Sequence, residues 1–539
     1  MRESVYTITF ERNSTEGKMR KFIQGAAKII FSRMLIIFLM ILIQIFVLGV
    51  SFLRFGSYMH FISEGVSILG VLLIVHIINK DEPTEFKLTW CIIICVLPVL
   101  GALIYLFVTC NVGGLGLRKA YKRSVKESAH LLFTSPETME KLKAYPASLR
   151  GFAHYLEKKE GYPSYHNTGA VYYATGEDKL EALVEELKKA EKYIFLEYFI
   201  LYKGTMWDAV LNVLKQKVKE GVEVRVMYDG MCAILELPYR YPKELAKYGI
   251  KAKMFAPIMP FLSTNQNNRD HRKIVVIDGK VAFTGGVNIA DEYINQKILY
   301  GHWKDVAVKI TGEAVRSFVV MFLQMWNMSE SQKDVYEDYL PAGAADELQE
   351  MQADAEKQGI VIPYGETPTD TNETAKNVYQ SIFQNATEYV HIMSPYFIVE
   401  REFLDHMRHA SERGVEVALI LPHIPDKKIV YYIARTFYPE LLEAGIKVYE
   451  YEPGFVHAKA FVSDDVCATV GTVNLDYRSF YHHFECGTYF YDHAVVKAVE
   501  EDFQKTLQEC IPVTEEYYAR IPFWQKWAGK LFRLVAPLL

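Results

Sequence analysis

Long apolar runs dominate the first 110 residues of the chain. A helix needs about 20 consecutive apolar residues to cross the roughly 30 Å hydrocarbon core of a bilayer, so runs of this length predict transmembrane helices. A secretory signal peptide would have a shorter apolar core followed by a small-residue cleavage site, and Arg54 and Phe55 fit that pattern poorly. We therefore predict a transmembrane region over 34–110, behind a basic segment over 1–33, with apolar segments at about 34–53, 58–78 and 88–108.

The basic residues on either side of this region bear on its orientation. Seven Lys or Arg lie within 1–33 and five within 118–126. Because loops rich in Lys and Arg stay on the cytoplasmic side, both flanks are predicted to be inside, which three full crossings cannot satisfy. Either one segment does not cross, with Glu64 making the second segment the candidate, or the basic amino end lies outside. We favour a multi-pass protein of the cell membrane in which the large domain that follows the third segment lies in the cytosol.

From about residue 165 the apolar positions alternate between helical spacing and short continuous runs. A helical pattern around Leu183 precedes the run 193–201, which predicts a buried strand. The same order recurs in the second half, where Gly414-Val-Glu-Val repeats Gly221-Val-Glu-Val. Such a repeat predicts an α/β fold of two similar lobes, each a mixed sheet flanked by helices. The predicted order is a connecting segment at 111–164, lobe 1 at 165–330, an acidic connector at 331–374, lobe 2 at 375–520 and an amphipathic tail at 521–539.

One polar motif occurs once in each lobe. It is H-x-K-x4-D-x6-G-x2-N, and every position of the second copy lies 186 residues after its counterpart. A lone H-x-K carries little information, but five matched positions in two copies are hard to attribute to chance. The motif residues are His271, Lys273, Asp278, Gly285 and Asn288 in lobe 1, and His457, Lys459, Asp464, Gly471 and Asn474 in lobe 2.

The spacing within the motif indicates a β-hairpin. Residues 273–277 are predicted to form a short apolar strand that ends in a tight turn and a returning strand. Side chains alternate across a strand, so His271 and Lys273 face the same way. The odd spacing takes Asp278 off that face and to the turn, as it does Asp464 in lobe 2. We therefore expect the two Asp residues to hold the hairpins rather than to touch a substrate.

The motif brings together an imidazole, an ammonium and an amide, twice, with no acidic cluster to hold a metal. Such a set suits an anionic phosphodiester. The lysines and amides hold the non-bridging oxygens, one His attacks phosphorus, and the other His protonates the leaving oxygen. No metal and no cofactor are predicted. The alternative is two surface hairpins with satisfied histidines, and the repetition argues against it.

Composition narrows the class of partner. The net charge of -5 and the pI near 6.3 argue against a nucleic-acid-binding surface, which would normally be basic. The seven cysteines are odd in number and include no C-x-x-C pair, so neither a disulfide framework nor a zinc site is indicated. A reducing, cytosol-facing environment is the simpler interpretation.

The doubled motif resembles that of the phospholipase D superfamily, whose paired motifs form one active site between two similar lobes. The apolar hairpin over 66–107 and the stretch Asn474-Leu-Asp-Tyr-Arg-Ser-Phe are similar to those of bacterial cardiolipin synthases, in which Asn is more frequent than His at the position of His483. The resemblance covers most of the chain from about 60 to 539. It implies phosphatidyl transfer between two phosphatidylglycerol molecules, which gives cardiolipin and glycerol through a phosphatidyl-histidine intermediate.

The resemblance also implies roles for single residues. The acids Asp305 and Glu485, downstream of the two motifs, would orient the histidines, in some members across the lobe interface. We expect His271 to attack phosphorus and His457 to protonate the departing glycerol. The predicted catalytic set is His271, Lys273, Asp278, His457, Lys459 and Asp464, and Asn288 and Asn474 are predicted to bind the substrate phosphate.

The same residues would also support other activities. A hydrolytic phospholipase D uses water in place of the lipid alcohol, and another phosphatidyltransferase would use another head-group alcohol. A membrane scaffold with inactive lobes is the non-enzymatic alternative, and two complete motifs argue against it. The predicted partners are a phospholipid substrate and the bilayer, without nucleic acid; the oligomeric state is left open.

Two apolar segments lie outside the motifs. The stretch from Gly249 to His271 in lobe 1 is ten residues longer than the matching stretch from Gly445 to His457 in lobe 2. The extra residues fall around the apolar loop 257–264. That loop is either core or a rim that contacts acyl chains, and we favour the rim. In the tail, Trp524 and Trp527 interleave with Lys526 and Lys530, which predicts an in-plane interfacial helix or, alternatively, a helix packed on the lobes.

Overall fold

The computed structural model describes residues 59–109, 112–232, 236–257, 268–330, 333–340 and 359–538, together with residues 42, 46, 49 and 50. The basic segment 1–33 and nearly all of the first predicted transmembrane segment lie outside the described residues. Most of the apolar loop 257–264 lies outside them as well.

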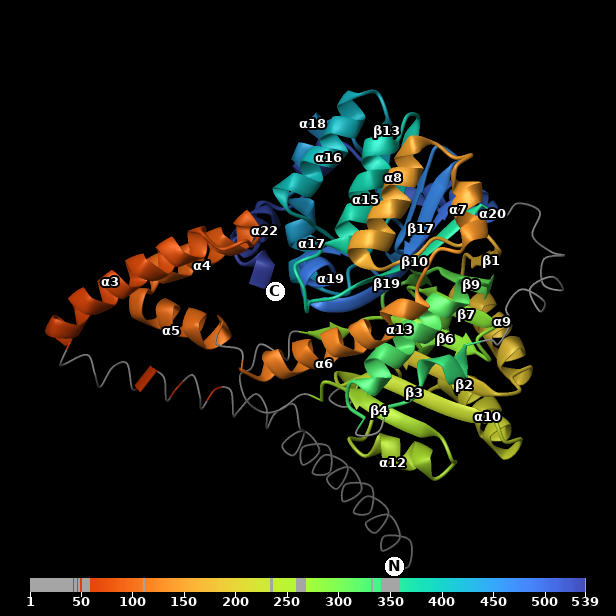
Figure 1. Ribbon diagram of the computed structural model, residues 1–539. Coiled ribbons are helices and arrows are strands. Elements are labelled where there is room, and N and C mark those ends of the chain that lie inside the picture. Colours follow the sequence, from red (N-terminus) through yellow and green to blue (C-terminus); the bar gives the residue numbers. More distant parts are fainter. Residues whose placement is uncertain are drawn as a thin grey trace, which may run out of the picture.

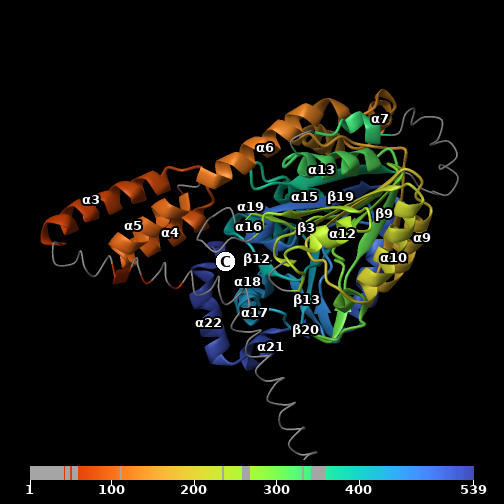
Figure 2. The same ribbon diagram turned by 90° about the horizontal axis from the view of Figure 1, so that it is seen from below.

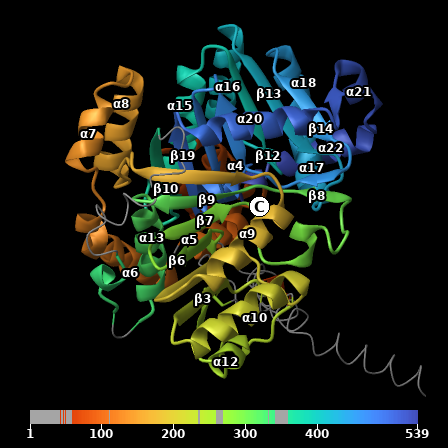
Figure 3. The same ribbon diagram turned by 90° about the vertical axis from the view of Figure 1, so that its right-hand side faces the viewer.

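Two mixed β-sheets, one in each lobe, form the centre of the molecule, and the lobes lie one above the other (Figures 1 and 3). The sheet of lobe 1 has the order β1-β9-β7-β6-β2-β3-β4. Strands β2 and β6 have no exposed residue because both of their faces are covered, which explains their continuous apolar sequence. The strands are β1 (Thr168–Tyr173), β2 (Tyr193–Tyr198), β3 (Glu223–Asp229), β4 (Lys251–Phe255), β6 (Lys273–Ile277), β7 (Val281–Gly285) and β9 (Ala307–Gly312).

The sheet of lobe 2 repeats this arrangement, with the order β10-β19-β17-β16-β11-β13-β14-β20. In each lobe a central strand pairs in parallel with the next strand of its own sheet along the chain, and antiparallel with the strand that follows the motif His: β2 with β3 and β6, and β11 with β13 and β16. The repeat predicted from the sequence is therefore a repeat of topology. The strands are β10 (Ile360–Glu366), β11 (Tyr389–Met393), β13 (Glu416–Pro422), β14 (Lys447–Tyr451), β16 (Ala460–Ser463), β17 (Cys467–Gly471), β19 (His483–Tyr491) and β20 (Cys510–Val513).

Two helices join the lobes through a shared core. Helix α13 (Val315–Asn327), in which every residue except Arg316 is buried, packs on β6 of lobe 1 and β10 of lobe 2. Helix α20 (Ala494–Leu507) makes the equivalent contact from the other lobe, because it packs on β16 of lobe 2 and on β1 of lobe 1. One continuous hydrophobic cluster contains Phe318 and Phe322 from α13 together with Val470 and Phe503 from lobe 2. Burying this surface fixes how the two sheets face each other.

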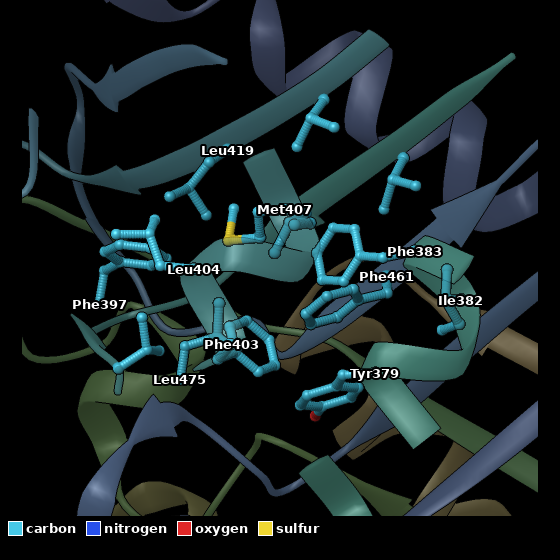
Figure 4. Packing of buried hydrophobic residues seen from close by; sticks show 14 of the residues in the cluster. Tyr379, Ile382, Phe383, Phe397, Phe403, Leu404, Met407, Leu419, Phe461 and Leu475 are labelled. Carbon is cyan, nitrogen blue, oxygen red and sulfur yellow. The ribbon is translucent and has the colours of Figure 1, made fainter. Parts of the chain in front are cut away.

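The other helices cover the outer faces of the sheets. In lobe 2 the space between α15, α16 and the sheet is filled by stacked aromatic and aliphatic side chains, among them Phe383, Phe403, Met407 and Phe461 (Figure 4). Lobe 1 carries α9 (Gly176–Lys188), α10 (Thr205–Lys219) and α12 (Tyr241–Ala246). Lobe 2 carries α15 (Thr374–Asn385), α16 (Arg401–Glu412), α17 (Lys428–Arg435), α18 (Tyr438–Glu443), α19 (Tyr477–Tyr481) and α21 (Glu515–Arg520).

Helices from the amino-terminal region project away from the lobes (Figures 1 and 2). Helix α3 (Met59–Ile78) corresponds to the second predicted apolar segment. It packs against α4 (Thr84–Val96) and α5 (Pro98–Thr109). Among the residues that the structure describes, no helix is both long enough and apolar enough to cross a membrane. Toward the lobes follow α6 (Val112–Ser128), α7 (Pro136–Leu142) and α8 (Ala147–Tyr155).

The third apolar segment, predicted as one stretch over 88–108, is two helices in the structure. The helix breaks at Leu97, whose ψ of 71° is not helical. Pro98 is the cause, because proline lacks the N–H that would continue the helix and disfavours a helical conformation in the residue before it. The two halves fold back on each other, with the rings of Trp90 and Tyr105 in contact at 5.3 Å between centroids.

The carboxyl-terminal tail lies beside this hairpin. Helix α22 (Phe523–Arg533) packs on α17 at Gly529, where a Cβ atom would lie 2.2 Å from the Tyr432 carbonyl oxygen. The hydroxyl of Thr89 in α4 donates a hydrogen bond to the Leu534 carbonyl oxygen at 2.9 Å. The first and last described segments of the chain thus meet at one corner of lobe 2.

The segment predicted as an acidic connector contains a strand of lobe 2. Residues 360–366 form β10, which pairs along its whole length with β19, so this part of 331–374 belongs to the second sheet. At the other end of the segment, Asp334 forms an ion pair with the buried Arg225 of β3 and stays on lobe 1. Residues 341–358 lie outside the described residues.

Candidate active site between the two lobes

Each lobe contributes a short strand to the other, immediately before its motif His. Strand β5 (Arg269–Asp270) pairs in parallel with the start of β19, with Asp270 opposite Phe484. The backbone N–H of His271 continues this ladder by donating to the Phe484 carbonyl oxygen at 2.9 Å. The next residue on the partner strand is Glu485. The register therefore places the lobe 2 acid beside the lobe 1 imidazole.

The same exchange is made in the opposite direction. Strand β15 (Gly454–Val456) of lobe 2 pairs in parallel with β8 (His302–Lys304) of lobe 1. The N–H of His457 donates to the Lys304 carbonyl oxygen, and Asp305 follows next in lobe 1. Two equivalent segments thus cross the lobe boundary, which gives the site an approximate twofold symmetry.

Each imidazole is hydrogen-bonded to an acid of the opposite lobe. His271 Nδ1 lies 2.8 Å from Glu485 Oε2, and His457 Nδ1 lies 2.6 Å from Asp305 Oδ2. Both carboxylates are fully buried, and the two histidines are 5% and 6% exposed. A carboxylate on Nδ1 fixes the proton there, which leaves the Nε2 lone pair of each ring free for chemistry. The acids picked out in the sequence are thus brought to the histidines, and each goes to the histidine of the other lobe.

The two motif Asp residues lie at the hairpin turns, away from the imidazoles. Asp278 and Asp464 have left-handed backbone conformations, with φ of 54° and 56°. The Asp278 carboxylate accepts hydrogen bonds from the backbone N–H groups of 191–193 at 2.7–2.8 Å. The Asp464 carboxylate does the same with 387–389. Each Asp ties its hairpin to the start of the neighbouring central strand.

The two motif lysines are buried next to the histidines. Lys273 Nζ donates to the His271 carbonyl oxygen at 2.5 Å, and Lys459 Nζ contacts the His457 carbonyl oxygen and lies 2.8 Å from His457 Nδ1. Burial lowers the pKa of Lys273 to about 8 and that of Lys459 to about 7. Burial, followed by the charges of the two lysines, holds the pKa of both imidazoles well below the usual value. The site thus buries two lysines, whose pKa values are raised by the nearby carboxylates Glu485 and Asp305 but lowered more by burial.

The two motif amides differ in their surroundings. Asn288 Oδ1 accepts the N–H of Ile200 at 3.0 Å, and its Nδ2 donates to the Tyr293 hydroxyl at 2.7 Å. The ring of Tyr293 in turn lies 5.4 Å from that of His457. Asn474 Oδ1 is buried and has no hydrogen-bond partner among the described residues. An unpaired buried acceptor is costly, which distinguishes Asn474 from the fully paired Asn288.

His483 is a site residue that the sequence did not assign. Its ring lies 5.3 Å from the ring of His271, and its Nδ1 lies 3.4 Å from Glu485 Oε1. Arg478 Nε donates to His483 Nε2 at 3.3 Å, so the proton of the neutral ring is on Nδ1 and points to Glu485. At the equivalent position of the other half-site stands Trp303, whose ring lies 5.4 Å from that of His457. The sequence signal was its place two residues before the acid.

Two further residues, Gly286 and Thr472, contact the buried carboxylates that orient the histidines. A Cβ atom at Gly286 would lie 1.9 Å from Asp305 Oδ1, so only glycine leaves room for that carboxylate. The position 186 residues later is Thr472, whose hydroxyl donates to Glu485 Oε2. Burial raises the pKa of Asp305 to about 6. The two half-sites therefore have the same arrangement of histidine and acid, but the surroundings of the two carboxylates differ.

His271, His483 and Glu485 have the residue types of a metal site, with ligand atoms within 4.8 Å of one another. Their hydrogen bonds do not fit a metal. A cation on His483 Nδ1 would have to displace a proton from a ring whose Nε2 already accepts a bond from Arg478. These three residues fit a proton-bearing network better.

Comparison with known proteins places this site in a family. The profile described as "Cardiolipin synthase, PLD-like domain" matches residues 183–326 and 379–507, and "Phospholipase_D-nuclease N-terminal" matches 68–108. An uncharacterised protein of Streptococcus mutans serotype c is 45% identical over 86% of this chain and 99% of its own length. The cardiolipin synthase of Geobacillus kaustophilus is 33% identical over 88% of this chain and 92% of its own.

A solved structure agrees in fold. The phosphatidylserine synthase of Haemophilus influenzae superimposes with a TM-score of 0.50 and 15% identity, over 68% of this chain and 93% of that protein. With two matched domains, one doubled motif and relatives aligned over most of their length, the chain belongs to the cardiolipin synthase family of phospholipase D-like enzymes.

Proposed function

We propose that this protein is a cardiolipin synthase, which transfers the phosphatidyl group of one phosphatidylglycerol to the glycerol hydroxyl of another and releases glycerol. The observation that carries the proposal is the pair of cross-lobe contacts, His271 with Glu485 and His457 with Asp305. They orient the Nε2 atoms of two imidazoles in one site, and a two-step exchange at phosphorus requires one such ring neutral as the nucleophile and the other protonated as the general acid.

In the first step His271 Nε2 attacks phosphorus. A phosphorus–nitrogen bond forms, the phosphorus–oxygen bond to the glycerol head group breaks, and His457 supplies the proton to the departing oxygen. In the second step His457 takes the proton of the incoming lipid hydroxyl. That oxygen attacks phosphorus, the phosphorus–nitrogen bond breaks, and His271 is regenerated. His457 thus gives one proton to the departing glycerol and gains one from the incoming hydroxyl, so it ends the cycle in the state in which it began.

The buried lysines prepare the site for an anion. Lys273 and Lys459 are held beside the imidazoles at the cost of lowered pKa values. A phosphodiester placed between them would offset their mutual repulsion and raise the pKa of both lysines and both histidines. It would also favour protonation of His457 at the moment a general acid is needed. The unpaired Asn474 Oδ1 suits a glycerol hydroxyl, which can donate to it.

We assign the nucleophile to His271 and the acid–base role to His457. Glu485 Oε2 accepts from Thr472 as well as facing His271, and Glu485 Oε1 lies 3.4 Å from His483 Nδ1, so the acid behind His271 is held in a fixed orientation. Asp305 has a pKa raised to about 6, so its carboxylate is ionised at neutral pH and can stabilise the imidazolium that His457 becomes when it acts as the acid. Trapping of labelled lipid tests the order: the covalent adduct should be lost in His271→Ala and retained in His457→Ala. The reverse pattern would exchange the two roles.

We further propose that the protein is anchored in the cell membrane by its amino-terminal region, with the two lobes on the cytosolic side. The basic residues at 118–126 support this orientation. The apolar side chains that α3 exposes, such as Val71 and Leu72 at 61% and 60%, support contact with lipid. Reporter fusions after residue 115 test it, and an external signal there would contradict a cytosolic catalytic domain.

The decisive assay is incubation of the purified protein with labelled phosphatidylglycerol. Cardiolipin as the product supports the proposal. Phosphatidic acid would identify a hydrolytic phospholipase D, because water would then be the acceptor. No product, in a preparation that binds phosphatidylglycerol, would favour a scaffold. His457→Ala is the matched control, since it removes one imidazole and leaves the cross-lobe strands in place.

A further inference from the structure

The proposed reaction brings the phosphates of two lipids close together. The buried lysines of the site surround only the phosphate that reacts. Lys273 and Lys459 are 2% and 1% exposed and lie against the two histidines, where the reacting phosphorus must be. The acceptor lipid carries its own phosphate, three carbon atoms away from the hydroxyl that attacks. That second phosphate must therefore lie just outside the buried centre, on the side from which the hydroxyl approaches.

A lysine stands at such a place in lobe 2. Lys427 lies between β13 and α17 and is 63% exposed. It lines a small hollow together with Tyr396, Pro425 and Phe455. The Phe455 ring lies 5.9 Å from the His457 ring, so this hollow adjoins the imidazole to which we assign the acid–base role.

The contacts of Lys427 leave its charge available. Its Nζ lies 4.9 Å from the centre of the Tyr396 ring. Among the described residues, the nearest carboxylate oxygen is that of Asp426, at 4.0 Å. Asp426 is itself engaged, because the Tyr396 hydroxyl donates to its Oδ2 at 2.6 Å. The ammonium is held in place by an aromatic face without being neutralised.

The charge of Lys427 reaches the reaction centre. It contributes to the lowered pKa of both His271 and His457, and it lowers the pKa of Asp476 against the effect of burial. Its neighbour Lys428 is also exposed and is not among the charges that act on these imidazoles. Of the two adjacent lysines, Lys427 is the one directed to the site.

The lobes differ at this position. In lobe 1 the loop that follows the equivalent strand, 230–240, has Ile234 five residues after the strand, where lobe 2 has Lys427, and its one basic residue is Arg240, next to α12. A cation at this place in the loop is therefore a feature of lobe 2, the lobe of His457. The two lipids are not equivalent in the reaction, so one extra cation on one side is what a distinct acceptor site requires.

The geometry points to Lys427 as the residue that binds the phosphate of the acceptor lipid. This assignment rests on the proposed function, because it divides that one site into donor and acceptor parts. The acceptor lies with its phosphate on Lys427, its hydroxyl beside His457 and its acyl chains over α17 and α22, where Ile429 and Trp527 are exposed. Lys427 thereby favours an anionic lipid alcohol over water or a neutral alcohol.

Competition between acceptors tests the assignment. The purified full-length protein is given labelled phosphatidylglycerol in mixed micelles together with ethanol, so that cardiolipin and phosphatidylethanol form from the same intermediate. In Lys427→Met the ratio of cardiolipin to phosphatidylethanol should fall about tenfold, the effect of losing one hydrogen bond to a charged group. Lys427→Arg should keep most of the ratio, and the matched control Lys428→Met should leave it unchanged.

The outcomes separate this proposal from the proposed function. If the wild type forms both products and Lys427→Met keeps their ratio, the acceptor site is overturned and the synthase activity stands. Equal loss of both products in Lys427→Met would place the lysine at the donor phosphate and would also overturn it. If the wild type forms neither product, the function itself fails and the assignment fails with it.

Discussion

Single residues set the chemistry through their protonation states. Asp305 is buried and its pKa is raised to about 6, whereas burial lowers the pKa of Lys459 to about 7 and that of Lys273 to about 8. Asp305 is therefore ionised above about pH 6, and the lysines keep their charge below about pH 7 to 8. The charges that the mechanism uses coexist in a narrow range around neutrality.

The pH dependence of kcat/KM follows from these values. It should be bell-shaped: kcat/KM falls below about pH 6 as Asp305 gains a proton, and it falls again above about pH 7 to 8 as the lysines lose theirs. Steady-state rates from pH 5 to 9 on labelled phosphatidylglycerol measure it. Asp305→Asn should lower the maximum and remove the acid limb near pH 6. An acid limb that is unchanged in that variant would contradict the assignment.

His483 acts through Glu485 and is a positioning residue. Its Nδ1–H faces the second carboxylate oxygen, at 3.4 Å. The Nδ2 atom of an asparagine can replace this donor at nearly the same place along the side chain. His483→Asn should therefore keep kcat within about twofold, whereas His483→Leu should lower kcat about tenfold, in the range found when partners of a catalytic ligand are removed.

KM and thermal stability control for a structural effect of His483. Both should change little in His483→Leu, and the pH profile of kcat should shift because His271 loses support for its tautomer. If His483→Asn and His483→Leu lower kcat equally, the N–H donor of His483 does not account for the effect of this residue.

At the scale of elements, the motif hairpins depend on their turns. Asp278 combines a left-handed backbone with a carboxylate that accepts three backbone N–H groups of 191–193. Asp464 repeats both features in lobe 2. The same Asp therefore serves both the turn and the attachment of the hairpin to the central strand, which is a structural reason for an Asp at this place in both copies of the motif.

Substitution of Asp278 separates stability from chemistry. Asp278→Ala should cost about 2 kcal/mol of unfolding free energy, from lost hydrogen bonds and the strain of alanine at a φ of 54°. The melting temperature should fall by several degrees while kcat per folded molecule is kept. Asp278→Asn should lose less unfolding free energy, because asparagine tolerates this left-handed backbone. A large fall in kcat at an unchanged melting temperature would move Asp278 into the catalytic set.

At the scale of the whole molecule, exposed apolar surface gathers at one corner of lobe 2. Phe523, Trp524 and Trp527 of α22 are 79%, 57% and 58% exposed, and α4 meets this helix through Thr89. Trp524 also packs its ring against Tyr432, at 5.4 Å. The tail is therefore both docked on the lobe and open to the surroundings, which combines the two alternatives left by its sequence.

This surface predicts an interfacial contact with lipid. Phe523→Glu together with Trp527→Glu should weaken binding to phosphatidylglycerol vesicles and lower activity on them about tenfold, because charged groups are excluded from the acyl boundary. Activity on a short-chain soluble substrate should be kept. Ile298→Glu, at a side chain of lobe 1 that is 77% exposed, is the matched control. Equal loss on both substrates would show a structural role for α22 instead.

The sequence by itself determined the local units: the doubled motif, the strand and turn that place His271 and Lys273 on one face, and the recurrence of these units in two lobes. These follow from periodicities of a few residues, which the chain encodes next to one another. The break in the third apolar segment was not predicted, although Pro98, which causes it, is present in the sequence.

Only the tertiary structure decided which acid serves which histidine. Glu485 lies 214 residues from His271, and Asp305 lies 152 residues from His457. Their pairing depends on the exchange of β5 and β15 between the lobes, and that exchange depends on the apolar surfaces of α13 and α20 being buried together. Contacts across such separations are fixed by packing of the whole core, which no local pattern contains. The places of β10 in the second sheet and of His483 behind Glu485 were decided in the same way.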